Sequence, residues 1–348
     1  MRRCTAAVEA LAKRFEMSNL PFMIDPLFFG TLNQSQQKLL FKKNVELVSI
    51  ETHSKCNRRC WFCPNAHHDR HSQNKEMTDA LFHKILDELT EIRYDGALSL
   101  SGNNEPLLDP NFAERRVRLA KAKLPNARLM FFTNGDYLSP GVLKRLVDEG
   151  IDYIYVSLYA DYHKELYSFE KAEALINSLA KKLNVAIEFE SRPNEHFCKA
   201  YGKAGGSTAV SFSSNNHRTT SVNRADAVAQ DAPIPKRTNR NKVCSYIFNN
   251  IVIGYDGSVL FCCQIINDYP AHRNLIMANL NDQTCYEAFA SDKFKQFRLN
   301  HVSNINMKPC GDCAECPDAD FIYNAPLLPH ISRPWARSAV HCISPQFF

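Results

Sequence analysis

The pattern of apolar and polar positions changes period repeatedly along the first two thirds of the chain. Residues 45–52 alternate apolar and polar positions, as a half-buried strand does. After Thr78, which is suited to cap a helix, Leu81, Ile85 and Leu89 recur at helical spacing. Further strands are predicted at 97–101, 128–132, 153–158, 185–190 and 209–213, and further helices at 112–123, 140–149 and 163–183. This alternation predicts an α/β fold of repeated β-α units around a parallel sheet of six strands.

Composition divides the chain into three parts. Residues 1–43 place Ala6, Val8, Leu11 and Phe15 at near-helical spacing and predict a helical lead-in that packs on the rest. Residues 44–215 carry the β-α units. Residues 202–241 are rich in Gly, Ser, Asn, Thr and Pro, so we expect a linker there and a second module over 216–348.

Three cysteines follow the first predicted strand in the spacing C-x3-C-x2-C, at Cys56, Cys60 and Cys63. Thiolates so placed can occupy three corners of an iron–sulfur cube and leave one iron open to another ligand. A zinc site completed by one of three histidines (His53, His67 or His68) is the alternative. A disulfide is less favoured, because the cysteines occur at metal-ligand spacings and no secretory segment accompanies them.

This spacing, with the aromatic Phe62 directly before Cys63, resembles the radical S-adenosyl-L-methionine (SAM) superfamily. The resemblance implies a partial (β/α)6 radical SAM barrel. It also implies a [4Fe–4S] cluster on the three cysteines, whose open iron SAM chelates through its amino and carboxylate groups. Phe62 would then lie beside the adenine.

Other residues match SAM-contacting positions of the same family. Glu105, in Leu100-Ser-Gly-Asn-Asn-Glu-Pro106, stands where a Gly-Gly-Glu motif binds the SAM amino group, although asparagines replace the glycines. Ser157 is expected at the SAM ribose, and Arg192 could pair with the SAM carboxylate through a bidentate fork. The alternatives are that Glu105 is a solvated turn residue, that Ser157 is bonded to backbone and that Arg192 is solvated. Thr133-Asn-Gly135 supports the register of the third strand.

A second set of cysteines lies near the end of the chain. A hairpin turn at Asp256-Gly257 should bring Cys262 towards Cys244. Together with Cys310, Cys313 and Cys316, this set resembles the SPASM/Twitch subgroup, which implies an auxiliary [4Fe–4S] cluster on Cys244, Cys262, Cys310 and Cys313. Either Cys263 or Cys316 could replace a neighbouring ligand, and Ala319 favours the shorter Twitch form with one auxiliary cluster. A structural zinc ribbon is the alternative.

Composition constrains partners and location. The net charge of the 348 residues is +5, and neither a dense Lys/Arg run nor an apolar stretch long enough for a membrane helix occurs. We therefore expect no nucleic acid or membrane partner. With 13 cysteines at metal-ligand spacings, a cytoplasmic location is expected.

The resemblance implies an enzyme that reductively cleaves SAM to a 5′-deoxyadenosyl radical and modifies a substrate, an auxiliary cluster taking up an electron. An external one-electron reductant, such as a flavodoxin or ferredoxin, would be required. A small polar substrate, of the sugar or aminocyclitol kind, is favoured over a peptide, because the 44 residues before the first strand are too few for a leader-binding domain. A non-catalytic iron–sulfur or zinc protein is the remaining alternative. We expect Arg224 to act as a base or substrate anchor, although a solvated loop arginine would look the same.

Overall fold

A computed structural model describes residues 25–72, 75–162, 166–190, 195–222, 224–229, 231–234, 244 and 246–303. The helical elements are η2 (Pro26–Phe29), α2 (Gln34–Asn44), η3 (Pro64–Ala66), α3 (Asp79–Glu91), η4 (Pro106–Leu108), α4 (Pro110–Lys123), α5 (Pro140–Asp148), α6 (Phe169–Leu183), α7 (His217–Thr220), α8 (Tyr246–Asn249), η5 (Pro270–Leu275), α9 (Cys285–Phe289) and α10 (Asp292–Ser303). The strands are β1 (Leu47–Ile50), β2 (Ala97–Ser99), β3 (Arg128–Thr133), β4 (Tyr153–Ser157), β5 (Ile187–Phe189), β6 (Phe197–Ala204), β7 (Thr208–Asn215), β8 (Asn250–Ile253), β9 (Ser258–Leu260) and β10 (Ile276–Asn279).

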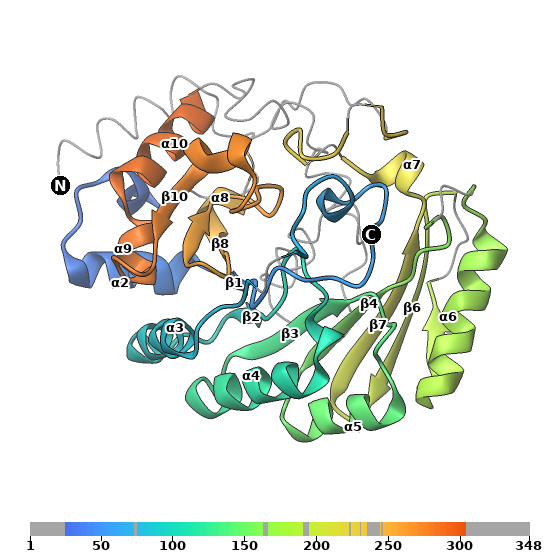
Figure 1. Cartoon of the computed structure of the whole chain (residues 1–348). Helices are drawn as coiled ribbons and strands as arrows, with labels where there is room; N and C mark the ends of the chain where they lie inside the picture. The colour runs from blue at the N-terminus through green and yellow to red at the C-terminus, as the bar shows by residue number, and fades with distance from the viewer. Residues whose placement is uncertain are drawn as a thin grey trace.

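The described strands form one sheet in the order β10-β9-β8-β1-β2-β3-β4-β7-β6-β5. Six neighbouring strands, from β8 to β7, run parallel, while the two strands at each edge join by antiparallel pairing. Helices α3 to α6 lie in an arc along one side of the parallel strands (Figure 1). The predicted α/β fold with a partial barrel is confirmed.

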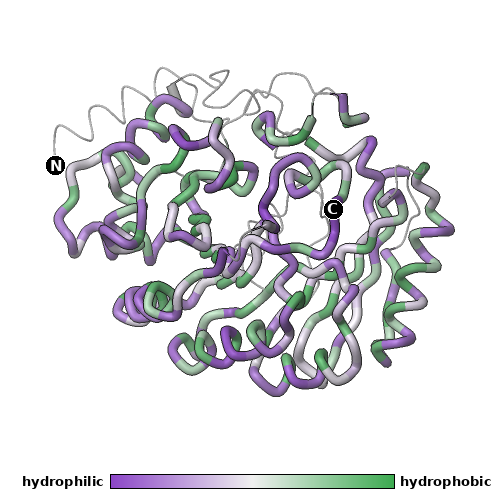
Figure 2. Tube along the Cα trace, viewed as in Figure 1, coloured by the Kyte–Doolittle hydropathy of each residue, from purple (hydrophilic) through white to green (hydrophobic). Residues whose placement is uncertain are grey.

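The helices pack on the sheet through apolar faces. Ile85 of α3, Val117 of α4, Leu146 of α5 and Ile176 of α6 are fully buried in the same core as Leu129 of β3. The Thr78 hydroxyl accepts a hydrogen bond from the Leu81 amide, so the predicted cap begins α3. Green and purple segments alternate along α6, as one apolar and one polar helix face require (Figure 2).

The C-terminal segment of the described chain packs on η2 and α2. The Phe41 ring contacts Phe289 of α9 edge to face, with ring centroids 5.5 Å apart. Phe28 of η2 contacts Phe248 of α8 in the same way, with centroids 5.1 Å apart. The described end of the lead-in therefore packs against the C-terminal segment, whereas Ala6, Val8, Leu11 and Phe15 lie outside the described residues.

One strand assignment made from the sequence is wrong, and one strand of the parallel sheet was not expected there. Residues 185–190 were expected as the fifth parallel strand, but β5 lies at the sheet edge, paired with the unpredicted β6. The sixth parallel strand is β8, which comes from beyond the expected boundary near residue 215 and pairs with β1. The sequence of β6 hides it, because Lys199, Gly202 and Lys203 interrupt its apolar positions.

The helix predicted at 163–183 is shorter than expected. Residues 163–165 lie outside the described residues, and α6 begins at Phe169 with Ser168 as its cap. Strands from before and after residue 215 belong to the same sheet, so the sheet itself marks no domain limit there. The expected division into 1–43, 44–215 and 216–348 stays a prediction. In the described part of the chain, no helix has both the length and the apolar composition that crossing a bilayer requires.

Replacing Gly202 by alanine tests the pairing of β5 with β6. An added Cβ would lie 2.6 Å from Val185 Cγ1 and closer still to the Ala186 carbonyl oxygen. We expect Gly202→Ala to lower the free energy of unfolding by about 1–3 kcal/mol, measured by chemical denaturation. Gly141→Ala is the matched control in α5, where the nearest atom would be Arg145 Nη1 at 3.6 Å, and it should be neutral or slightly stabilising. Equal stability of the two variants would contradict this pairing.

Candidate active site and metal centres

The cysteine loop leaves the carboxyl end of β1 and contributes to a pocket. Cys56, Cys60 and Cys63 all line it as free thiols. Loops after the next three strands complete the wall with Asn103, Asn104, Glu105, Asn134 and Tyr159. The carboxyl ends of parallel strands are where α/β barrels carry their chemistry, so the pocket lies where the sequence predicted it.

Burial holds the three thiols in their neutral form. It raises the pKa of Cys56 to about 12, and it also raises the pKa values of Cys60 and Cys63 above the ordinary range. For Cys63, the positive charge of Arg224 opposes the effect of burial. Metal ligation by these residues would therefore release protons.

The histidines offered as zinc ligands are bonded elsewhere. His67 Nε2 lies 2.9 Å from the Trp61 carbonyl oxygen, and His68 Nε2 lies 2.9 Å from that of Ala227. His53 Nδ1 accepts from the Lys55 amide at 3.2 Å. Within the described ranges, no three His, Cys, Asp or Glu side chains converge on one point as ligands of a single metal ion. Three thiols around one pocket suit a larger, multi-iron group better than a Cys3His zinc site.

Glu105 is a buried carboxyl in this pocket, with 1% of its surface exposed. Oε1 accepts from Thr133 Oγ1 at 2.6 Å and from the Leu107 amide at 3.0 Å, and Oε2 accepts from the Asn134 amide at 2.7 Å. Burial raises the pKa of Glu105 to about 7, although these hydrogen bonds favour the ionised form. The glutamate is thus a fixed acceptor between β2 and β3, not a solvated turn residue.

The Thr133-Asn-Gly135 turn continues into Asp136, which supports the cysteine loop. Arg58 Nε and Asn57 Nδ2 each donate to Asp136 Oδ2 at 2.7 Å. Gly135 has φ +80°, a conformation that glycine adopts without strain. This turn therefore positions the cysteine loop. From the sequence, it was expected only to support the register of the third strand.

Phe62 stacks on a histidine that the sequence did not single out. Its ring lies parallel to His217, with centroids 3.4 Å apart and an interplanar angle of 3°. Asp161 holds His217 through both carboxylate oxygens, at 2.7 Å to Nδ1 and 2.9 Å to the amide. One face of Phe62, the residue expected beside adenine, is thus covered by His217. No motif links Asp161 and His217, which meet because β4 and β7 are neighbours.

Ser157 belongs to a row of polar residues across three strands. It pairs in register with Ser213 of β7, which pairs with Lys199 of β6. The Ser157 hydroxyl is buried and finds no hydrogen-bond partner among the described residues, so the expected alternative of a backbone bond is absent there. Burial lowers the pKa of Lys199 to about 8, and Glu190 opposes this shift. Lys199 was not identified from the sequence.

The second cysteine set is described only in part. The hairpin turns at Gly257 as predicted, and Cys262 and Cys263 follow β9 as half-buried free thiols. The Cys244 amide donates to His301 Nε2 at 3.1 Å. A hydrogen bond from Cys262 lowers the pKa of Cys263, and Arg224 acts in the same direction. Cys310, Cys313, Cys316 and the expected SAM ligand Arg192 lie outside the described residues, so the ligand set remains a prediction.

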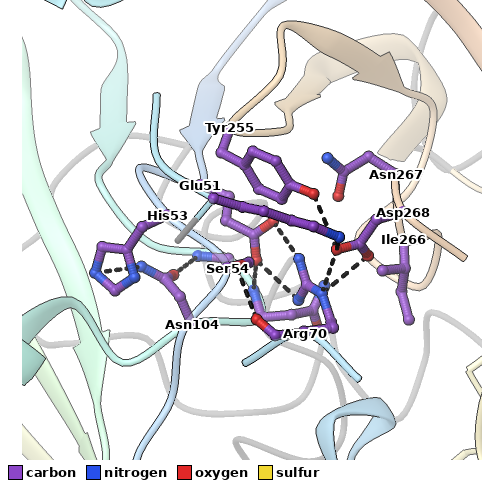
Figure 3. A network of polar contacts seen from close by, with 12 residues as sticks. Glu51, His53, Ser54, Arg70, Asn104, Tyr255, Ile266, Asn267 and Asp268 are labelled. Atoms are coloured by element: carbon purple, nitrogen blue, oxygen red, sulfur yellow. Dashed lines mark hydrogen bonds and ion pairs between the residues drawn. The ribbon is translucent and has the colours of Figure 1, made fainter. Parts of the chain in front are cut away.

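A buried arginine joins the cysteine loop to the C-terminal segment. Arg70 Nη2 pairs with Glu51 Oε2 at 2.8 Å, and Arg70 Nε pairs with Asp268 Oδ1 at 2.9 Å. Asp268 also accepts from the Tyr255 hydroxyl (Figure 3). Glu51 Oε1 accepts from the Asn103 amide at 2.7 Å. The network thus fixes β1, the cysteine loop, the Glu105 loop and the segment after Cys263 relative to one another.

Family comparisons match both halves of this arrangement. The radical SAM superfamily matches residues 50–191, and the SPASM iron–sulfur cluster-binding domain matches residues 244–317. The chain belongs to the radical SAM superfamily, in its SPASM/Twitch subgroup.

Individual relatives of this radical SAM enzyme are distant. The S-adenosyl-L-methionine-dependent 2-deoxy-scyllo-inosamine dehydrogenase of Niallia circulans is 25% identical over 256 residues, covering 74% of this chain and 86% of that protein. A tungsten-containing aldehyde ferredoxin oxidoreductase cofactor-modifying protein of Pyrococcus furiosus is 21% identical, covering 87% of this chain and 98% of that protein. The crystal structure of BtrN in complex with AdoMet and 2-DOIA shares the fold, with a TM-score of 0.53 and 23% identity over 77% of this chain and 93% of that chain.

Radical SAM and SPASM domains bind [4Fe–4S] clusters and SAM, which are therefore the cofactors of this enzyme. The pocket fits them, because three thiols and a fixed carboxyl share its wall and no described histidine competes for the sulfurs. We expect Cys56, Cys60 and Cys63 to hold the first cluster and Glu105 to accept from the SAM amino group.

The affinity for SAM should depend on the ionisation of Glu105. As the pH falls from 8 to 6, through the pKa of about 7, this carboxyl takes up a proton and becomes a weaker hydrogen-bond acceptor for the SAM amino group. We expect the Kd for SAM to rise roughly tenfold over this range in anaerobically reconstituted protein, measured by equilibrium binding. Glu105→Gln is measured at each pH, because the ratio of the two proteins removes the titration of SAM itself. A ratio that does not change with pH would exclude this role.

Removing Arg70 should destabilise the fold, because it leaves Glu51 and Asp268 buried without their partner. We expect Arg70→Met to lower the free energy of unfolding by about 3–5 kcal/mol in chemical denaturation. Arg118→Met is the matched control, since Arg118 pairs with Glu149 at the surface, and its change should stay below about 1 kcal/mol. A loss no larger than that of the control would show that the network is not needed for stability.

Proposed function

We propose that this radical SAM enzyme is an oxidoreductase that oxidises a small polar molecule of the sugar or aminocyclitol kind. The observation that carries the proposal is the similarity to a SAM-dependent aminocyclitol dehydrogenase, which extends over 74% of the chain. When bound, the cofactors supply reductive cleavage of SAM to a 5′-deoxyadenosyl radical, with the auxiliary cluster accepting an electron.

The inner face of the sheet supports a hydroxylated substrate. Register places Tyr155, Ser157, Ser211, Ser213 and Lys199 on one face of neighbouring strands. The opposite face carries residues of the apolar core under the helices, namely Val156, Phe212 and Ala200. The polar face therefore looks away from the helices and offers hydroxyl and ammonium groups that can hydrogen-bond a polyol.

The chain's own residues would then exclude water and orient the reactants. The Phe62–His217 stack is buried beside the cysteines, and the half-buried Tyr159 packs against Phe62, so the pocket has an apolar, water-poor side. We propose that Lys199 and the three serines of this face, Ser157, Ser211 and Ser213, orient the substrate. A flavodoxin- or ferredoxin-like protein would supply the electron.

SAM cleavage tests the proposal with variants of each cysteine set. With SAM and dithionite, the reconstituted protein should form 5′-deoxyadenosine, and Cys56→Ala should abolish it because the cluster loses one of three ligands. Cys262→Ala should retain SAM cleavage but lose oxidation of 2-deoxy-scyllo-inosamine, followed by mass spectrometry. Cys198→Ala is the control, because Cys198 is a buried core residue of β6. Cleavage with no oxidised product from any of a panel of aminocyclitols and sugars would contradict the substrate class, and product formation with a peptide panel would replace it.

A further inference from the structure

Arg224 lies in an unusual turn between the two cysteine sets. Arg224, Ala225 and Asp226 have φ of 57°, 54° and 65°, three successive left-handed residues without a glycine. Such backbone is costly and persists only where its surroundings impose it.

Two histidines from different segments hydrogen-bond to backbone carbonyl oxygens of this turn. His68, five residues after Cys63, bonds the Ala227 carbonyl oxygen through Nε2 at 2.9 Å. His272, nine residues after Cys263, bonds the Ala225 carbonyl oxygen through Nε2 at 2.7 Å. The turn is thereby held between the segments that follow the two cysteine sets.

The Arg224 side chain is a buried charge without a carboxylate partner. It is 2% exposed, its Nη2 donates to Asn103 Oδ1 in the pocket wall, and its Nε has no partner among the described residues. In the same part of the chain no Asp or Glu forms an ion pair with it, whereas Arg70 pairs with two carboxylates. An unpaired buried charge is expensive, so an anionic group should face this guanidinium.

Thiolate-ligated clusters are the anionic groups that both neighbouring sites would hold. Arg224 Nη2 donates to Asn103, which lines the same pocket as Cys63, while His272 of the segment after Cys263 bonds the backbone of the residue that follows Arg224. A guanidinium only donates hydrogen bonds, which favours an electrostatic role over that of a base. Net charge and hydrogen bonding around a cluster set its reduction potential.

We propose that Arg224 is the buried counter-charge shared by the two iron–sulfur sites, and that it raises their reduction potentials. This rests on the cofactors assigned above but not on the identity of the substrate. A positive charge stabilises the reduced cluster, which carries one more electron than the oxidised cluster.

Potentiometric titration followed by electron paramagnetic resonance tests this on the reconstituted full-length protein without substrate. In Arg224→Gln, we expect the ratio of reduced to oxidised first cluster at the wild-type midpoint to fall at least tenfold, equivalent to a shift of about 59 mV to more negative potential. The auxiliary cluster should shift in the same direction. Arg224→Lys, which keeps the charge, should restore most of the potential, and Arg116→Gln, a buried arginine paired with Asp79, should change neither cluster.

Asn103→Asp provides a second variant if Arg224→Gln does not retain its clusters. It places a carboxylate against the intact guanidinium and should also lower the potential of the first cluster. Unchanged midpoints in a cluster-replete Arg224→Gln or Asn103→Asp protein would overturn the inference, and weakened SAM binding at unchanged potential would instead assign Arg224 to the SAM carboxylate. Because the potentials are measured without substrate, a failure of aminocyclitol oxidation would leave this result intact.

Discussion

The buried ion pairs of Arg70 hold the functional loops of this enzyme in one arrangement. Its guanidinium joins Glu51, at the end of β1, to Asp268, beyond the second cysteine set. Charges removed from water are stable only when the geometry satisfies them, so each partner restricts where the others can lie. Since Glu51 also accepts from the Asn103 amide, the same constraint reaches the loop that carries Glu105.

A second constraint comes from the sheet, whose two faces differ in chemistry. The face under α3 to α6 is apolar, and its burial supplies most of the driving force for folding. The opposite face of β4, β6 and β7 carries hydroxyls and Lys199, which gain less from burial. Ser211 shares a hydrogen bond with Tyr153 and Ser213 donates to Asn215, whereas the Ser157 hydroxyl has no partner among the described residues.

Arg70 and Arg224 show two uses of a buried guanidinium. Arg70 is paired with two carboxylates and belongs to the framework. Arg224 lacks such a partner in the described part of the chain, and it is held by strained backbone between the two cysteine sets. A charge compensated within the protein stabilises the fold, whereas one left uncompensated can act on a bound group.

Local features could be predicted from the sequence because each is set by residues close together in the chain. The Cys56–Cys63 spacing with Phe62, the position of Glu105 after β2, the cap at Thr78 and the turn at Gly257 are of this kind. The tertiary structure alone decided which distant segments meet. It placed β8 beside β1, inserted β6 between β7 and β5, stacked His217 on Phe62 and paired Arg70 with Asp268. Strand neighbours and buried charge pairs depend on packing between residues far apart in the chain, and neither leaves a periodic signal in the sequence.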